Sequence, residues 1–323
     1  MAPNGKSEIF TILGAGGSIG NALTHELLAA GKQVRLMSRS GTSWPGAETV
    51  RGDVTSLRET VDALKRSRVA FLCVGLRYDT RVWSDLWPRI MANVIEACLV
   101  NDTRLVFFDN VYMYGLVEGA MTENTPYQPC SRKGEIRAAI ATQMETAMSR
   151  GHLRGIIARS ADLYGPYATR SSIPYLLVFD RLQNGKQAQW LANDRLPHSF
   201  SYTRDCAKAL VLLSAQEDAL NQVWHLPTAH PAIDGLTFIG LVATASGVAP
   251  RHTVLRKWMI RLAGLADPTL RELYEMLYQQ DHPYHFDSTK FERAFSFVPT
   301  SYPDGIRDTL RFLLPHGTAQ HSP

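Results

Sequence analysis

Cysteine is scarce in this sequence, with four residues, at positions 73, 98, 130 and 206, in a chain of 323. None belongs to a Cys-x-x-Cys pair or lies near a histidine at metal-ligand spacing, so we expect free thiols in a reducing compartment and no metal site. Apolar runs as long as a membrane span are missing, and the first ten residues lack the apolar core of a secretion signal. The sequence therefore predicts a cytoplasmic protein that does not bind membranes.

Clusters of positive charge are missing as well. The 34 Lys and Arg residues only slightly exceed the 30 Asp and Glu residues, for a formal net charge of +4. Because nucleic-acid-binding proteins gather basic residues along the phosphate backbone, binding to nucleic acids is not expected. What the sequence does contain is an ordinary globular composition, 45% hydrophobic, with several aromatic residues late in the chain.

Short apolar segments alternate with helical ones through much of the chain. Strands are predicted at 8–13, 32–39, 69–75, 104–110 and 153–160, and helices at 21–30, 83–99, 134–150 and 203–216. Strands that are apolar on both faces and separated by helices are typical of a parallel sheet covered on both sides. We therefore predict an α/β fold with a Rossmann-type, doubly wound parallel sheet. The dinucleotide-binding domain is placed at 1–165 and 200–226, and a smaller C-terminal substrate lobe at 166–199 and 227–323.

A glycine-rich loop, GAGGSIG, joins the first strand to the first helix. Glycine lets such a turn bend tightly and lets its backbone approach a pyrophosphate, while the helix N-terminus supplies free N–H groups. The loop thus predicts a dinucleotide cofactor, held by Gly14, Gly17, Ser18, Ile19 and Gly20.

The end of the second strand distinguishes the two nicotinamide dinucleotides. An acidic residue there hydrogen-bonds the ribose 2′-hydroxyl of NAD, whereas an arginine suits the 2′-phosphate of NADP. This chain has Ser38-Arg39-Ser40 and no acid, so NADP is predicted in preference to NAD. The predicted cofactor contacts beyond the glycine loop are Ser38, Arg39, Asp53, Val54, Val74 and Gly75, with Asp53 and Val54 at the adenine.

Further motifs follow in order along the chain: GDV (52–54), VFFDNVYMYG (106–115), YGP (164–166), FSYTRDCAKAL (200–210) and a tail over 286–310. With the glycine loop, they resemble the extended short-chain dehydrogenase/reductase superfamily, in its NAD-dependent epimerase/dehydratase branch. The resemblance implies an enzyme that binds NAD(P) and a small-molecule substrate. It also implies a homodimer formed through helices 83–99 and 134–150.

The catalytic motif of that superfamily is not matched. Its members usually carry a Ser or Thr four residues before a Tyr-Gly pair, and a Tyr-x-x-x-Lys on the next helix. By the resemblance, Asn110 stands in the hydroxyl position, Lys133 in the tyrosine position and Arg137 in the lysine position. The chain is thus identified as an atypical member that lacks the Tyr-x-x-x-Lys motif.

Two residues are candidates for the proton donor. Lys133 can act as an acid or polarise a carbonyl as a fixed cation, and Arg137 lies one turn away on the same helix. Tyr112 points the same way as Asn110 if the strand continues, and the Asn110 amide can face an oxyanion. Alternatively, Lys133 and Arg137 are solvated helix charges or hold the nicotinamide ribose.

The substrate position departs from the family as well. Nucleotide-sugar members have an arginine that grips a diphosphate just before the equivalent of FSYTRD, where this chain has His198. A nucleotide sugar is therefore not expected, and His198 and Tyr164 are assigned to another substrate. The lobe also holds a predicted helix over 267–280, with Asp267 as its N-cap, and aromatic residues that favour an apolar or aromatic small molecule. These are Trp190, Tyr202, Trp258, Tyr274, Tyr278 and Tyr284.

Three functions fit these features. The first is an NADP(H)-dependent oxidoreductase that reduces a carbonyl or activated double bond of a small, apolar or aromatic metabolite. The second keeps the cofactor without net redox change, as an epimerase, dehydratase or isomerase. The third is a catalytically degenerate regulatory protein that binds NADP and a partner.

Overall fold

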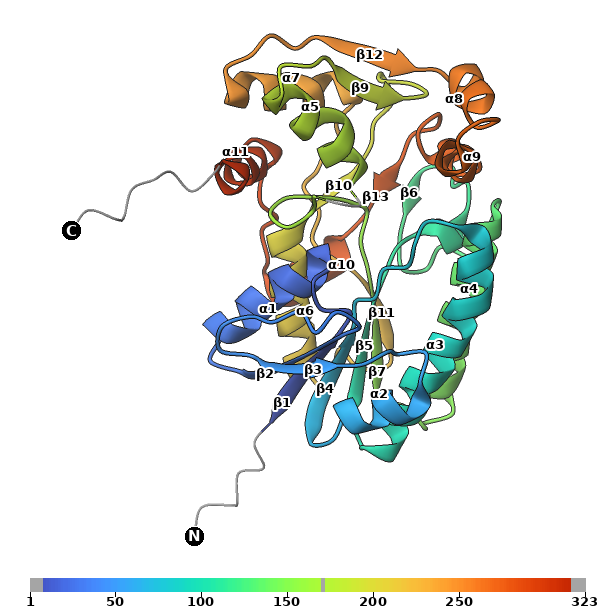
Figure 1. Cartoon of the computed structure of the whole chain (residues 1–323), viewed down its shortest axis with the longest axis vertical. Coiled ribbons are helices and arrows are strands. Elements are labelled where there is room, and N and C mark those ends of the chain that lie inside the picture. The colour runs from blue at the N-terminus through green and yellow to red at the C-terminus, as the bar shows by residue number, and fades with distance from the viewer. Residues whose placement is uncertain (1–7, 170–171, 315–323) are drawn as a thin grey trace, which may run out of the picture.

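The structure is a computed structural model that describes residues 8–169 and 172–314. Its centre is a seven-stranded sheet in the order β11-β7-β5-β4-β1-β2-β3, and every neighbouring pair is parallel (Figure 1). The strands are β1 (Ile9–Leu13), β2 (Gln33–Ser38), β3 (Glu48–Arg51), β4 (Ser67–Leu72), β5 (Arg104–Asp109), β7 (Gly155–Arg159) and β11 (Gln222–His225). The chain adds β2 and β3 on one side of β1 and the later strands on the other. This reversal opens a crevice at the carboxyl ends of β1 and β4, the usual ligand site of such sheets. The predicted Rossmann-type fold is confirmed.

Helices cover both faces of the sheet. On one face lie α1 (Ser18–Ala29) and α6 (Thr203–Ala215), and on the other α2 (Leu57–Ala63), α3 (Thr80–Val100) and α4 (Arg132–Ser149) (Figure 1). Successive residues of β4 point to opposite faces of the sheet. Phe71 packs with α1 and α6, whereas Leu72 packs with α3 and α4. Both layers are apolar, which is why the strand sequences show no polar alternation.

Local sequence fixes where the site-bearing helices begin and end. The Asp79 carboxylate accepts the N–H groups of Arg81 and Val82 at the start of α3, and the Ser131 hydroxyl accepts the N–H of Gly134 at the start of α4. Gly151 follows α4 with a φ of +71°, a conformation that terminates helices and favours glycine.

The remaining chain forms a smaller lobe beyond the carboxyl edge of the sheet (Figure 1). Its aromatic core contains Phe179, Trp190, Phe200 and Phe238. Its elements are β8 (Asp162–Tyr164), a π-helical turn (Tyr175–Phe179), α5 (Asp180–Gln183), β9 (Ala188–Leu191), β10 (Phe200–Tyr202), α7 (Gly235–Ser246), β12 (His252–Leu255), α8 (Lys257–Ala263), α9 (Pro268–Tyr274) and α11 (Tyr302–Leu313). Short β6 (Ala120–Met121) pairs with β13 (His285–Phe286), and α10 (Thr289–Phe295) returns the chain to the sheet beside β11. Within the described ranges, no helix combines the length and apolarity that crossing a bilayer requires.

The helix predicted over 267–280 is shorter in the structure. Asp267 caps it as predicted, because its carboxylate accepts the N–H of Thr269, but α9 ends at Tyr274 and a 3-10 turn follows at Leu277–Gln279. Leu277 is fully buried against Leu191. Burial of this leucine in the lobe thus overrides a helical pattern that continues in the sequence.

Candidate functional site

The glycine loop forms the floor of the crevice between β1 and β4. Gly14 has a φ of +99°, and a Cβ added there would lie 2.7 Å from the backbone of Val74. A Cβ on Gly20 would lie 2.8 Å from the carbonyl oxygen of Gly14. The first glycine therefore permits the turn, and the last brings α1 against the loop. The backbone is left accessible in the way that a dinucleotide pyrophosphate requires.

A cleft of about 330 Å³ extends from this loop across the ends of β1 to β4. Eight of the eleven predicted cofactor residues line it: Gly14, Gly17, Ser38, Arg39, Asp53, Val54, Val74 and Gly75. Ser18, Ile19 and Gly20 lie in the first turn of α1 instead. Sequence reasoning missed Ala15, Met37, Ser40, Gly52, Leu76 and Ile90. Most of these are next to predicted residues in the sequence. Ile90 comes from α3, and no local sequence motif predicts its place in the cleft. The residues and the bare backbone fit a dinucleotide.

The outer end of the cleft carries positive charge and hydroxyl groups. Ser38, Arg39 and Ser40 line it, and the Nε of Arg51 donates to the carbonyl oxygen of Arg39 over 3.1 Å. Asp53 also belongs to the lining, but its carboxylate accepts the N–H of Thr55 within its own turn. Arg39 is exposed and available to an anion.

The candidate catalytic residues do not belong to the cleft lining, but Tyr112 packs in the same apolar cluster as Leu76 and Tyr78. Strand β5 ends at Asp109, so Asn110 and Tyr112 do not continue a strand as expected, and Tyr112 begins a 3-10 turn (Tyr112–Tyr114). The Asn110 side-chain oxygen accepts the N–H of Tyr112 over 3.1 Å. Asn110 thus orients the turn.

The phenol of Tyr112 is held between aromatic neighbours. Its ring stacks on Trp83 with centroids 6.3 Å apart, and its hydroxyl is hydrogen-bonded with that of Tyr78. Burial, reinforced by the nearby Asp162 carboxylate, raises the pKa of Tyr112 well above its usual range. The phenol therefore stays protonated.

Lys133 is fully buried, and its ammonium group is enclosed by acceptors. Its Nζ lies 2.6 Å from the Glu275 carboxylate and 3.0 Å from the Thr80 hydroxyl, and it also donates to the Glu272 carboxylate. The ring of Tyr78 lies 4.6 Å away. The Glu272 carbonyl oxygen is a fourth acceptor at 3.2 Å, so the three donor hydrogens of the ammonium are all engaged. No sequence signal linked Lys133 to two carboxylates in the C-terminal lobe.

Arg137 lies deeper, beneath the end of β5. Its Nε donates to the Asp109 carboxylate over 2.8 Å, and the guanidinium lies 4.5 Å from the Trp87 ring centroid. Arg159 lies on the other side of the same carboxylate, with Nε 3.6 Å from its Oδ2. Arg137 is neither a solvated charge nor part of the cleft lining, since it secures the end of the central strand.

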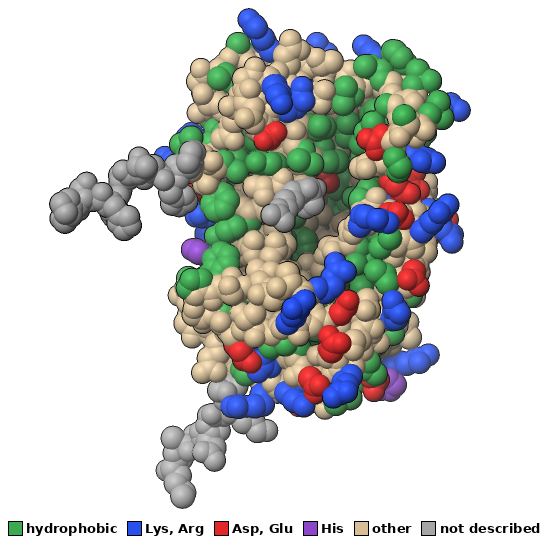
Figure 2. Space-filling model, in the orientation of Figure 1, with side chains coloured by type: hydrophobic (Ala, Val, Ile, Leu, Met, Phe, Trp, Pro, Cys, Tyr) green, Lys and Arg blue, Asp and Glu red, His purple; other side chains and the backbone are tan. Residues whose placement is uncertain are grey.

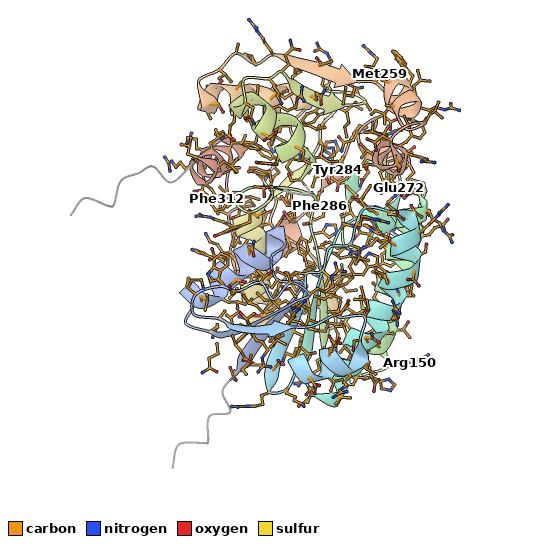
Figure 3. All side chains as sticks on the ribbon, viewed as in Figure 1. Arg150, Met259, Glu272, Tyr284, Phe286 and Phe312 are labelled. Atoms are coloured by element: carbon orange, nitrogen blue, oxygen red, sulfur yellow. The ribbon has the colours of Figure 1, made fainter. Side chains whose placement is uncertain are left out.

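On the lobe side, His198 and Asp162 form a second polar group. His198 Nε2 lies 3.0 Å from the Asp162 carboxylate, and the imidazole stacks on Tyr284 with centroids 4.3 Å apart. Asp162 and Gln280 are the polar residues of a small cavity of about 10 Å³ that is otherwise lined by apolar side chains. Figure 2 shows the surface hollowed between the lobe and the helices that cover the sheet, and Figure 3 places Tyr284 where these two parts meet.

Tyr164, expected at the substrate, lies in the core of the lobe instead. It is 1% exposed and packs against Tyr202, Phe238 and Tyr302. Its ring is part of the buried apolar core of the lobe, so it lines no cavity described above. Trp258, by contrast, is 61% exposed on α8. Over the described residues, no three His, Cys, Asp or Glu side chains gather as metal ligands would.

Comparison with solved structures agrees with this geometry. MoeE5 in complex with UDP-glucose and NAD shares 20% identity and a TM-score of 0.76, covering 94% of this chain and 98% of its own. DesIV, a dTDP-glucose 4,6-dehydratase from Streptomyces venezuelae with NAD and TYD bound, shares 18% identity and a TM-score of 0.76 over 94% and 96%. UDP-glucose 4-epimerase from Thermus thermophilus in complex with NAD shares 18% identity and a TM-score of 0.77 over 94% and 98%. These likenesses show a common fold.

The family is shown by the sequence itself. Residues 10–226, from β1 to just past β11, match the NAD dependent epimerase/dehydratase family, whereas no curated protein matches the chain. The matched region contains the glycine loop and both proton-donor candidates. It confirms the expected resemblance and the prediction of an NAD(P)-dependent enzyme. The chain therefore belongs to the NAD dependent epimerase/dehydratase family.

Proposed function

We propose that the protein is an NADP(H)-dependent enzyme that acts on a small metabolite with an apolar or aromatic part. The observation that carries the cofactor preference is the outer end of the cleft, where Ser38, Arg39 and Ser40 meet and β2 ends without a carboxylate. A 2′-phosphate is bound by a cation and hydroxyl donors, whereas the 2′-hydroxyl of NAD is usually bound by a carboxylate at the end of the second strand, where this chain has none. When bound, the nicotinamide supplies hydride transfer.

Calorimetry with NADPH and NADH tests this preference. We expect NADPH to bind at least about tenfold more tightly than NADH. An Arg39→Met variant should lose about tenfold in NADPH affinity, because a charge-assisted contact to phosphate is removed, and keep its NADH affinity. A wild-type protein that prefers NADH would reject the NADP assignment, and one that binds neither dinucleotide would reject the enzyme function.

Two reaction types remain, and different observations support them. The family match supports an epimerase or dehydratase, in which the nicotinamide is regenerated within each turnover. The charged outer end of the cleft supports net reduction with NADPH, as in an oxidoreductase. Loss of NADPH absorbance in proportion to product formed would identify the oxidoreductase. Product formed with bound cofactor and no such loss would identify the epimerase or dehydratase.

Tyr112 is the proposed proton donor in either reaction. Burial keeps the Tyr112 phenol protonated and able to pass a proton to a substrate oxygen, and the Tyr78 hydroxyl is its hydrogen-bond partner. Lys133 is less suited, because its donors are engaged by Thr80, Glu272 and Glu275. Tyr112→Phe should lower kcat by about 100-fold or more, as removal of a general acid does, without changing NADPH affinity. Unchanged turnover would return the role to Lys133.

The proposed substrate is not a nucleotide sugar. The position where nucleotide-sugar members of the family carry an arginine holds His198, paired here with the Asp162 carboxylate. A carboxylate at this place repels a diphosphate, and the cavity beside it is apolar apart from Asp162 and Gln280. We expect no calorimetric signal with UDP-glucose or dTDP-glucose in the presence of NADPH. Micromolar binding of either would overturn this substrate class.

A homodimer through α3 and α4 is also part of the proposal. The two helices lie side by side, and at the end of α3 the side chains of Leu99 and Val100 are 40% and 61% exposed. Burying such residues against a second copy would remove apolar surface from water. Light scattering should therefore give twice the mass of 36.0 kDa. A mass of one chain would remove the dimer from the proposal.

A further inference from the structure

Helix α9 reaches from the lobe to the first residues of α3 and α4. The Glu272 carboxylate accepts the N–H of Thr80 over 3.0 Å and its hydroxyl over 2.5 Å, and it accepts from Lys133 as well. The Glu275 carboxylate accepts from Lys133 over 2.6 Å and from the N–H of Arg132 over 3.1 Å. Figure 3 shows Glu272 on α9, near the first turn of α4. The two carboxylates join the lobe to both helices.

This junction depends on polar contacts. No residue of α9 is fully buried, and its apolar residues Leu270, Leu273 and Tyr274 pack toward Leu277 in the lobe. On the other side, Lys133 is 0% exposed and the two glutamates are about a quarter exposed. If α9 withdraws, the ammonium and both carboxylates become hydrated. The closed and open positions therefore differ by an exchange of ion pairs for water, which is a small net difference.

The junction lies beside the proposed reaction centre. Leu76 lines the inner end of the cleft, Tyr78 follows it, and Thr80 begins α3. The Lys133 ammonium lies over the Tyr78 ring, and the hydroxyls of Tyr78 and Tyr112 are hydrogen-bonded to each other. The carboxylates of Glu272 and Glu275 therefore contact α3 four residues beyond the cleft-lining Leu76, next to the tyrosine that is hydrogen-bonded to the proposed acid.

We propose that Glu272 and Glu275 are positioning residues that act through Lys133 and Thr80 to hold α9 closed over the inner end of the cofactor cleft. In this chain the family's tyrosine position therefore serves to close the site. The inference rests on the proposed function for the identity of the cofactor, because the enclosed group would be the nicotinamide.

The test compares the variant E272Q/E275Q with the control Glu135→Gln. Glu135 also pairs with a cation, Arg132, but on the exposed surface of α4. The first measurement is hydrogen exchange of the backbone over 268–275, which reports local opening. We expect exchange to be about tenfold faster in E272Q/E275Q than in the wild type, and unchanged in Glu135→Gln.

The second measurement is quenching of bound NADPH fluorescence by iodide, which reports exposure of the nicotinamide. The quenching constant should rise about threefold or more in E272Q/E275Q, with the NADPH dissociation constant changed by less than about threefold. If the two glutamates had a purely structural role, E272Q/E275Q would lower thermal stability without raising the quenching constant at an unchanged NADPH dissociation constant. The variant K133M/E272M/E275M replaces the buried ions with apolar side chains, and we expect it to restore slow exchange.

The outcomes separate the two proposals. Equal exchange and equal quenching in E272Q/E275Q and Glu135→Gln would overturn the role of the two glutamates. If the wild type binds no NADPH, the proposed function fails, while hydrogen exchange still decides whether the carboxylates hold α9. If E272Q/E275Q does not fold, the single variant Glu275→Gln decides, with an expected rise in exchange of about threefold.

Discussion

The cofactor cleft itself and the region beyond its inner end are formed by different kinds of groups. The glycine loop and the outer end consist mainly of backbone and small side chains, including Gly14, Gly17 and Gly52, together with the exposed Arg39. Beyond the inner end lie buried charges, including Lys133 at 0% exposure and Arg137 at 4%. The cleft is formed by short segments whose residues are close together in the sequence. The region beyond its inner end depends on pairs such as Lys133 with Glu275, which are 142 residues apart.

The largest effect is expected from removing one of the buried charges beyond the inner end. Arg137→Met would leave the fully buried Asp109 carboxylate with Arg159 at 3.6 Å. Because an underpaired buried charge is costly, we expect the free energy of unfolding to fall by about 3 kcal/mol or more. Urea denaturation at neutral pH measures this. Arg154→Met is the control, since the Arg154–Asp102 pair is exposed and should contribute less than about 1 kcal/mol. Similar losses in the two variants would show that burial is not what distinguishes the inner end.

In the glycine loop, the matching change is the addition of a single methyl group. Gly14→Ala places a Cβ 2.7 Å from the Val74 backbone, at a φ of +99°. Since neither backbone can yield, the loop must shift away from the pyrophosphate position, and we expect NADPH affinity to fall by about 100-fold. Gly31→Ala is the matched control, because Gly31 also has a positive φ, +69°, but no atom lies within 4 Å of its added Cβ. Calorimetry should show unchanged binding for the control. Normal NADPH binding by Gly14→Ala would mean that the loop does not hold the dinucleotide.

This difference in construction also explains what the sequence could predict. The strand and helix periods, the glycine loop and the Asp267 cap are local patterns, and the structure confirms them. The position of Lys133 on α4 was predicted, but its partners come from a separate helix of the lobe. Tyr164 stands in a family motif that does not indicate which side of the strand faces the core. Long-range packing decided these residues, and a single sequence carries no direct record of it.

A pH titration sharpens the contrast further, through His225 at the end of β11. The Nδ1–H donates to the carbonyl oxygen of Asp287, so Nε2 accepts from the Tyr114 hydroxyl, both over 2.8 Å. Burial, with further contributions from the cations Arg159 and Lys290, lowers the pKa of His225 to about 3. The unfolded chain therefore takes up this proton near pH 6.5 whereas the folded protein does not, and stability falls as the pH falls from about 6.5 towards 3.

The expected size of this effect is about 2 kcal/mol between pH 7 and pH 5. It is measured as the difference in unfolding free energy between the wild type and His225→Gln, which lacks the titrating imidazole. The wild type should lose about 2 kcal/mol more than the variant over this range. His152→Gln, at an exposed position, should follow the wild-type profile. Parallel profiles for the wild type and His225→Gln would show that the histidine is protonated or hydrated in the folded protein.

The smallest expected effect concerns a residue that does not line the cleft. The Nε of Arg51 donates to the carbonyl oxygen of Arg39 over 3.1 Å, so it holds the backbone that carries the proposed phosphate ligand. Arg51→Met should weaken NADPH binding about threefold, because one exposed hydrogen bond is lost, and leave NADH binding unchanged. Arg58→Met removes a cation from the nearby surface of α2 without that bond and should change neither affinity. If both variants weaken NADPH equally, the outer end attracts the phosphate through its general positive charge. A loss confined to Arg51→Met would instead show that even the locally specified end of the cleft depends on one contact between strands.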